Sequence, residues 1–237
     1  MSFANALEIL FEDNHLIAVN KPAGWPSAHF DGEEETVDRL VKAYLKEKYK
    51  KPGNVFLGVV HRLDKPVTGV LLFARTSKGA ARLSEQFREN AIEKTYWGIV
   101  EKPGDERKPW PLAGTLEDWL LKNHTTGVVH VVPPNTPEAK SALLHYTTKA
   151  TYDKLSWLDL RPQTGRTHQL RVQLASRGRP MYGDAKYGSQ FAFGPGIGLH
   201  ARSLTFLHPI RNEPITLTAE IPKTWRGRFA HLLAGRV

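Results

Sequence analysis

Short apolar runs separated by polar and turn-forming residues predict a chain built mainly from strands, with a few amphipathic helices. The clearest runs are residues 55–60 and 70–74, which are rich in Val, Leu and Phe and too short for helices. The polar residues 61–65, followed by Pro66 and Gly69, lie between them, so we expect a strand, a loop and a second strand. Such a loop holds its side chains at the edge of a sheet, where binding and catalytic groups are often found.

The same pattern predicts strands and helices along the rest of the chain. Expected strands are a hairpin within residues 8–20, a strand at 93–100, the pair 143–152 and 154–160, and an edge strand at 216–221. Expected helices are residues 36–50 with Thr36 as N-cap, a helix capped by Ser77, one with Leu170 and Leu174 facing inward, and a last helix that Pro222 opens. Because strands and helices do not alternate strictly, we expect an α+β fold with a large mixed, mainly antiparallel sheet and flanking helices.

Two segments rich in proline or glycine interrupt this pattern. Residues 101–140 contain several prolines around two short strand-like pieces and are expected to form an elaborated loop or small insertion. Residues 181–198 are rich in glycine and are expected to be mobile. With no internal repeat, residues 1–237 are expected to form a single domain.

Composition and charge narrow the possible partners. The 237 residues have a net charge of +9 and no cysteine, which excludes disulfides, a thiol nucleophile and a thiolate metal site. The basic excess indicates a polyanionic partner, most commonly nucleic acid, although an anionic membrane surface would attract the same charge. No apolar run approaches the ~20 residues that span a bilayer, and the N-terminus lacks a signal-peptide pattern. We therefore expect a cytoplasmic protein that does not bind membranes.

The ten histidines raise the question of a metal site. No H-x-H, H-E-x-x-H or carboxylate–histidine pairing occurs at the spacing of metal ligands. The glycine-rich segment 194–198 is not followed by Lys-Ser or Lys-Thr, as a phosphate-binding loop would be. The sequence therefore predicts neither a metal site nor a nucleotide cofactor.

Five collinear segments resemble the motifs of RluA-type RNA pseudouridine synthases. The first, HRLDKPVTGVLLFA at 61–74, has Val67 and Thr68 where that family commonly has Thr and Ser. The others are EKTY at 93–96, RPQTGRTHQLRV at 161–172, GDAKYG at 183–188 and LHA at 199–201. A further segment, NKPAG at 20–24, is similar to one that lines the active-site cleft in the family. The resemblance covers about residues 8–210 and implies the pseudouridine synthase catalytic fold.

The resemblance also implies roles for individual residues. Asp64 would be the nucleophile, and an ordinary carboxylate pKa of about 3.9 leaves such a group ionised at neutral pH. It would either attack the sugar or abstract a sugar proton to form a glycal, and the sequence leaves both open. Tyr96 would stack on uracil and assist proton removal from C5, and Arg166 would keep Asp64 ionised. The remaining residues expected at the RNA site are Arg62, which would fill the gap left by a flipped nucleotide, Leu170 as a wall of the base pocket, and His61, Lys94 and His168.

The function implied is the isomerisation of specific uridines in structured tRNA or rRNA to pseudouridine. We expect a monomer that needs no metal or organic cofactor. Because the match begins near residue 8, we expect no separate N-terminal RNA-binding module. Two alternatives are a non-catalytic RNA-binding or chaperone protein of the same fold, and a base-excising hydrolase that also uses one Asp. The hydrolase would release free uracil, whereas the synthase would not.

Overall fold

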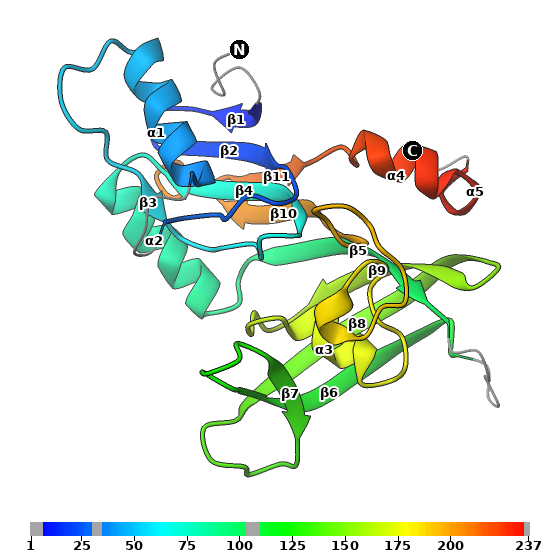
Figure 1. Cartoon of the computed structure of the whole chain (residues 1–237). Helices are drawn as coiled ribbons and strands as arrows, with labels where there is room; N and C mark the ends of the chain where they lie inside the picture. Colours follow the sequence, from blue (N-terminus) through cyan, green and yellow to red (C-terminus); the bar gives the residue numbers. More distant parts are fainter. Residues whose placement is uncertain (1–6, 30–34, 103–109, 235–237) are drawn as a thin grey trace. The chain divides into compact units, whose positions relative to one another are not determined.

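The computed structural model describes residues 7–29, 35–102 and 110–234 (Figure 1). The chain divides into two compact units. Unit 1 comprises residues 1–93 and 201–220, and unit 2 comprises residues 94–200 and 221–237. Asp64 therefore belongs to unit 1, whereas Tyr96 and Arg166 belong to unit 2.

Unit 1 is organised around antiparallel strands. Strand β2 pairs with β1 and β4, β10 follows β4 in the strand order, β11 pairs with β10, and the short β3 pairs with β4. Apolar residues of these strands form one core, which includes Leu16, Leu72, Leu204 and Leu217. The strand bounds are β1 Glu8–Glu12, β2 Leu16–Lys21, β3 Gly58–Val59, β4 Thr68–Ala74, β10 Leu199–Leu207 and β11 Pro214–Thr218.

The predicted strand–loop–strand around residues 61–69 is confirmed, although its first strand is shorter than expected. Strand β4 is buried along its whole length, as its continuous apolar run predicts. Strand β3 is only Gly58–Val59, and the nearby Phe56 is 51% exposed. A run of apolar residues can also occur in a loop that faces solvent. The strand predicted at residues 55–60 was therefore longer than the observed one.

Two helices belong to unit 1, α1 (Val37–Lys48) and α2 (Ser77–Arg88). Thr36 is the N-cap residue of α1, as predicted. The N-cap of α2 is Thr76 rather than Ser77, because the Thr76 hydroxyl accepts a hydrogen bond from Gly79 N at 3.2 Å. The predicted cap was therefore wrong by one residue, while the helix itself is present.

Gly69, at the start of β4, allows a close approach between strands. Its φ of +112° lies in the region that glycine adopts more readily than other residues. A Cβ atom at this position would overlap the backbone of Ala201 in β10. The strand that follows the Asp64 loop can therefore approach β10 only because residue 69 has no side chain.

The described residues of unit 2 form five antiparallel strands in the order β5-β9-β8-β6-β7. The turn between β8 and β9 is at Asp153, which has a φ of 51°. The predicted hairpin here and the predicted strand at 93–100 are both confirmed. The strand bounds are β5 Glu93–Glu101, β6 Ala113–Lys122, β7 Val129–Val132, β8 Lys140–Tyr152 and β9 Leu155–Pro162.

The segment predicted as a loop or small insertion contributes a long strand to this sheet. Strand β6 pairs with β8 from Ala113, opposite Thr147, to Leu120, opposite Lys140. Among the described prolines of this segment, Pro111 precedes β6 and the others, Pro133, Pro134 and Pro137, follow β7, so none of them interrupts the β6–β7 hairpin. Residues 103–109 of the same segment lie outside the described residues.

The helices of unit 2 are short: α3 Gln169–Ala175, α4 Lys223–Arg228, α5 Ala230–Leu233 and the 3-10 turn η2 Ala185–Tyr187. The last predicted helix is thus two helices, separated at Phe229. Its buried aromatic residues, Trp225 and Phe229, pack with Trp157 and Tyr182 in a core cluster.

The glycine-rich segment 181–198 belongs to unit 2 and is anchored there at both ends, while residues 185–195 are mostly exposed and the mobility expected of the segment stays a prediction. Tyr182 is 1% exposed, and the buried Asp184 accepts two hydrogen bonds from Arg171, at 2.7 and 2.8 Å. The sequence pattern missed this because the anchoring residue lies in α3, outside the segment itself.

The fold class predicted from the sequence, α+β with a large, mostly antiparallel sheet and helices beside it, is confirmed. Among the described residues, no helix has the length and apolar character needed to cross a bilayer.

Candidate active site

Asp64 lies in the loop that joins β3 to β4 in unit 1. Its carbonyl accepts a hydrogen bond from Val67 N at 3.0 Å, which closes a turn around Lys65 and Pro66. Leu63 and Val67 are both buried, whereas Asp64 between them is partly exposed. The loop is therefore anchored in the core on each side of the carboxylate.

Lys21, the last residue of β2, binds the backbone of this loop through its side chain. Its side chain is fully buried, and Nζ donates hydrogen bonds to Pro22 O, Lys65 O and Val67 O at 2.9, 3.1 and 2.8 Å. Three carbonyls match the three N–H donors of an ammonium group. Burial lowers the pKa of Lys21 from 10.5 to about 7, while the Asp64 carboxylate acts in the opposite direction.

The segment after Lys21 supplies two more supports for the loop. Ser27 Oγ donates to Leu63 O at 2.7 Å and accepts from Leu63 N at 2.9 Å. Gly24 N donates to Lys65 O at 2.9 Å. Residues 21–27, which the sequence marks as a loop rich in Pro and Gly, thus hold the backbone on both sides of Asp64.

His61 and Arg62 differ in their exposure and in their contacts. His61 Nε2 accepts a hydrogen bond from Leu72 N at 2.9 Å, and the ring stacks on Phe87 with centroids 4.8 Å apart. These contacts fix His61 between the loop, β4 and α2, whereas Arg62 is exposed. The prediction that both residues contact RNA stays a prediction.

In unit 2, Gln169 organises the loop that contains Arg166. Its Oε1 accepts hydrogen bonds from Arg166 N at 3.0 Å and from Thr164 Oγ1 at 2.8 Å. Its Nε2 donates to Leu143 O at 3.1 Å, and Leu143 N donates to Thr164 Oγ1 at 3.0 Å. The Arg166 side chain is exposed, and its Nε donates to Ser141 O at 2.9 Å.

Lys94 is electrostatically coupled to Arg166. Burial lowers the pKa of Lys94, and the positive charge of Arg166 lowers it further. Two cations close enough to repel each other in one unit form a region that favours an anion, such as a phosphate or a carboxylate. The structure therefore brings together two of the residues predicted for the RNA site.

Three other predicted residues lie on the elements next to these cations. Tyr96 is partly buried in β5, where it pairs with Leu160 of β9. Leu170 is buried in the first turn of α3. His168 precedes α3 with a φ of 53°, and its Nδ1 makes a 2.7 Å hydrogen bond with the Tyr187 hydroxyl.

The predicted contact between Asp64 and Arg166 joins residues of different units and stays a prediction. Within unit 1, the structure adds Lys21 and Ser27 to the residues that position Asp64. The sequence contained one sign of Lys21, a lysine at the end of an apolar strand and directly before Pro22. No group of three or more His, Cys, Asp or Glu residues suited to a metal ion occurs within 7–29, 35–102 and 110–234.

Known proteins resemble this chain in sequence and in fold. The family described as RNA pseudouridylate synthase matches residues 15–176. A tRNA pseudouridine synthase C of Yersinia pestis is 30% identical over 93% of this chain and 89% of its own length. Another protein of that name, from Pectobacterium carotovorum, is 31% identical over 96% of this chain, which spans 62% of that relative. A ribosomal large subunit pseudouridine synthase C of Buchnera aphidicola is 31% identical over 95% of this chain and 70% of its own length.

A solved structure supports the same assignment. Human RNA Pseudouridylate Synthase Domain Containing 4 superposes with a TM-score of 0.77 and 25% identity, over 98% of this chain and 94% of the human chain. The matched family region includes the Asp64 loop and the Arg166 loop. The chain therefore belongs to the RNA pseudouridylate synthase family.

Proposed function

We propose that this RNA pseudouridine synthase isomerises specific uridines of tRNA or rRNA, with Asp64 as its nucleophile. The observation that carries the proposal is the support of the Asp64 loop, whose backbone is bound on both sides by Lys21, Gly24 and Ser27. A nucleophile contributes most when its position is fixed before the substrate binds, because the reacting atoms must be aligned within a fraction of an ångström.

The reaction needs a group that can act at the sugar without entering the product. The N1–C1′ bond breaks, the uracil turns, a C5–C1′ bond forms, and the proton on C5 is lost to solvent while N1 gains one. A carboxylate at Asp64 would either bond to C1′ during this exchange or remove a sugar proton and return it later. In both routes the atoms of the uridine are conserved, and no redox partner is required.

The family resemblance supports roles for the other residues of the proposed site. Tyr96 would lie against the uracil ring, and Leu170 would form an apolar wall for it. Arg166 would stabilise the Asp64 anion, and Arg62 would occupy the space that a flipped nucleotide leaves. His61, Lys94 and His168 would complete the RNA site, His61 and His168 by supporting their loops.

The proposal includes the wider properties that the sequence predicted. The chain would act in the cytoplasm as a monomer and as one catalytic domain. It would need neither a metal nor an organic cofactor for the chemical step.

The proposal is tested by Asp64→Asn, which keeps the size of the side chain and removes its charge. We expect loss of tritium release from RNA that contains 5-tritiated uridine, with RNA affinity changed by no more than about tenfold, roughly 1.4 kcal/mol. Asp153→Asn is the matched control, because Asp153 is exposed in the β8–β9 turn and Asn tolerates its positive φ. Steady tritium release by Asp64→Asn would contradict the assignment, and free uracil from the unsubstituted protein would indicate a hydrolase instead.

A further inference from the structure

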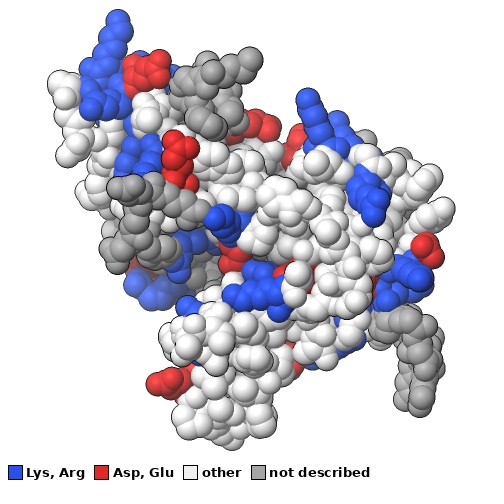
Figure 2. Space-filling model, viewed as in Figure 1, with Lys and Arg blue, Asp and Glu red and all other residues white. Residues whose placement is uncertain are grey.

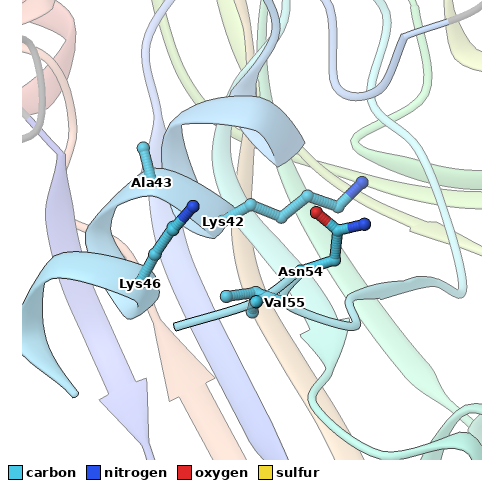
Figure 3. A pocket seen from close by; sticks show the side chains of 6 residues that line it. Lys42, Ala43, Lys46, Asn54 and Val55 are labelled. Atoms are coloured by element: carbon cyan, nitrogen blue, oxygen red, sulfur yellow. The ribbon is translucent and has the colours of Figure 1, made fainter. Parts of the chain in front are cut away.

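We propose that the surface hollow between α1 and residues 53–55 binds the phosphate backbone of RNA, separately from the Asp64 loop. This inference rests on the proposed function, since it supplies a second contact for the same RNA. The hollow has a volume of about 360 Å³ and is lined by Lys42, Ala43, Lys46, Gly53, Asn54 and Val55 (Figure 3). All six residues belong to unit 1.

The polar lining groups of the hollow are hydrogen-bond donors suited to an anion. Lys42 and Lys46 are four residues apart on α1 and therefore project from one face of the helix. Figure 3 shows the Lys42 side chain extending toward Asn54, with Lys46 on the neighbouring turn. Two ammonium groups and one amide provide the kind of donors that bind phosphate oxygens.

The charges around the hollow leave it with a positive balance. Asp38 faces Lys42 at 3.4 Å, but it is buried and also accepts hydrogen bonds from His29 N and Thr36 Oγ1. Glu47 is the exposed acidic residue on the same helix, and Lys50 and Lys51 follow it in the chain. Figure 2 shows both basic and acidic side chains over the region of α1, so the positive balance comes from the lining residues Lys42 and Lys46 and not from a uniformly basic face.

An exposed aromatic residue beside the hollow favours RNA over inorganic phosphate or an acidic peptide. Phe56 directly follows the lining residue Val55 and is 51% exposed. Proteins that bind single-stranded nucleic acid combine cations along the backbone with aromatic rings on which bases stack. Of these three candidates, RNA has both the phosphates that would bind Lys42 and Lys46 and the bases that would stack on an exposed ring such as Phe56.

A negative charge can be added at Gly53, on the rim of the hollow, without steric conflict. A side chain at Gly53 would meet no atom within 4 Å, so Gly53→Glu places a carboxylate at the rim without displacing its neighbours. Gly227 in α4 of unit 2 has the same property, so Gly227→Glu is a control with the same change in net charge. A second pair is Lys46→Gln and Lys78→Gln, since both lysines are exposed on helices of unit 1.

The variants are compared in the Asp64→Asn background, which leaves the RNA unmodified. The probe is a uridine-containing stem-loop with a single-stranded flank, and the measurement is Kd as a function of salt. We expect Gly53→Glu to raise Kd about tenfold and Lys46→Gln to make the slope of log K against log salt shallower by about 0.7 to 0.9. Gly227→Glu and Lys78→Gln should change Kd by less than about twofold.

Two outcomes would overturn the inference: an unchanged Kd for the hollow variants, or an equal loss in the hollow and control variants, which would reflect net charge alone. Thermal melting of each variant shows whether the fold is retained. If Gly53→Glu proves unstable, Lys46→Gln decides the question. Tritium release by the protein with Asp64 intact tests the proposed function independently, so a failure of one idea is distinguishable from a failure of the other.

Discussion

In both the Asp64 loop of unit 1 and the Arg166 loop of unit 2, a buried polar side chain makes several hydrogen bonds to the loop, but the chemistry of these two supports, Lys21 and Gln169, differs. Lys21 donates three hydrogen bonds to backbone carbonyls and has an electrostatic attraction to Asp64. Gln169 uses a neutral amide, which both donates to and accepts from its loop. Both supports are distant in sequence from at least one segment that they hold.

The difference between the two supports concerns charge. A cation beneath Asp64 favours the carboxylate that the proposed chemistry needs, at the cost of burying a charge. Beside Arg166 and Lys94, a third cation would add to the existing repulsion between these two, whereas a neutral amide adds none. The comparison predicts that replacing Lys21 lowers turnover more than replacing Gln169 does. It also predicts that the contribution of Lys21 to stability depends more strongly on pH.

Replacing Lys21 should have the largest effect. Lys21→Met keeps the length of the side chain but removes the Nζ donor from the carbonyls of Pro22, Lys65 and Val67, of which Lys65 O keeps its hydrogen bond from Gly24 N. We expect the free energy of unfolding to fall by about 2–4 kcal/mol, with relief of the buried charge offsetting part of the loss. Turnover at saturating RNA should fall about 100-fold, because the Asp64 loop loses its position.

Urea unfolding and tritium release measure these two losses. Lys78→Met is the control for removing a lysine from unit 1, because Lys78 is exposed on α2. Full turnover by a folded Lys21→Met protein would show that Lys21 does not position the nucleophile loop.

Replacing Gln169 should have a smaller effect. Gln169→Leu leaves Arg166 N and the Thr164 hydroxyl without their acceptor, while Leu143 O keeps its hydrogen bond from Gln163 N, and we expect a cost of about 1–3 kcal/mol in the free energy of unfolding. Gln163→Leu is the matched control, because Gln163 is exposed in the same loop. A loss of turnover greater than that of Lys21→Met would reverse the ranking of the two supports.

The smallest expected difference between the Lys21 and Gln169 supports is in how the free energy of unfolding depends on pH. The pKa of Lys21 is about 7 in the folded protein and 10.5 ordinarily, so between these values the unfolded chain binds more protons at this site. The free energy of unfolding should therefore rise with pH through this window, by up to about 1.4 kcal/mol per pH unit from Lys21.

Chemical unfolding at several pH values from 7 to about 9 tests this dependence. The stability difference between the unsubstituted protein and Lys21→Met should grow as pH rises, while the difference from Gln169→Leu should stay constant. Parallel curves for all three proteins would show that Lys21 does not titrate in this range.

The sequence predicted the place of Asp64 because the strand after it is a continuous apolar run that the turn residues Pro66 and Gly69 precede. It did not predict Lys21 as a support, since the partners of Lys21 are backbone carbonyls more than forty residues away, at Lys65 and Val67. Backbone acceptors leave no mark in the side-chain pattern. The motif at 161–172 identified Arg166, but not the bonds by which Gln169 shapes its loop.

The sequence was less informative where pairing decides the structure. Strand β6 has buried residues at Leu116 and Leu120, a spacing of four that fits one face of a strand or of a helix, and the residue between them on the strand face is the polar Asp118. Its length comes from pairing with β8, which the local pattern does not encode. Likewise, the segment around Asp184 is held by Arg171 of α3, and its glycines alone suggested mobility.

The discontinuity of unit 1 has a consequence for synthesis on the ribosome. Asp64 is made early, yet β10 and β11, which supply Leu204, Phe206 and Leu217 to the same core, are translated more than a hundred residues later. At 5–20 residues per second, that interval is on the order of ten seconds. During it, the nascent chain exposes the apolar residues of β4 that later pack with β10 and β11, a surface that chaperones on the ribosome would encounter before the core of unit 1 is complete.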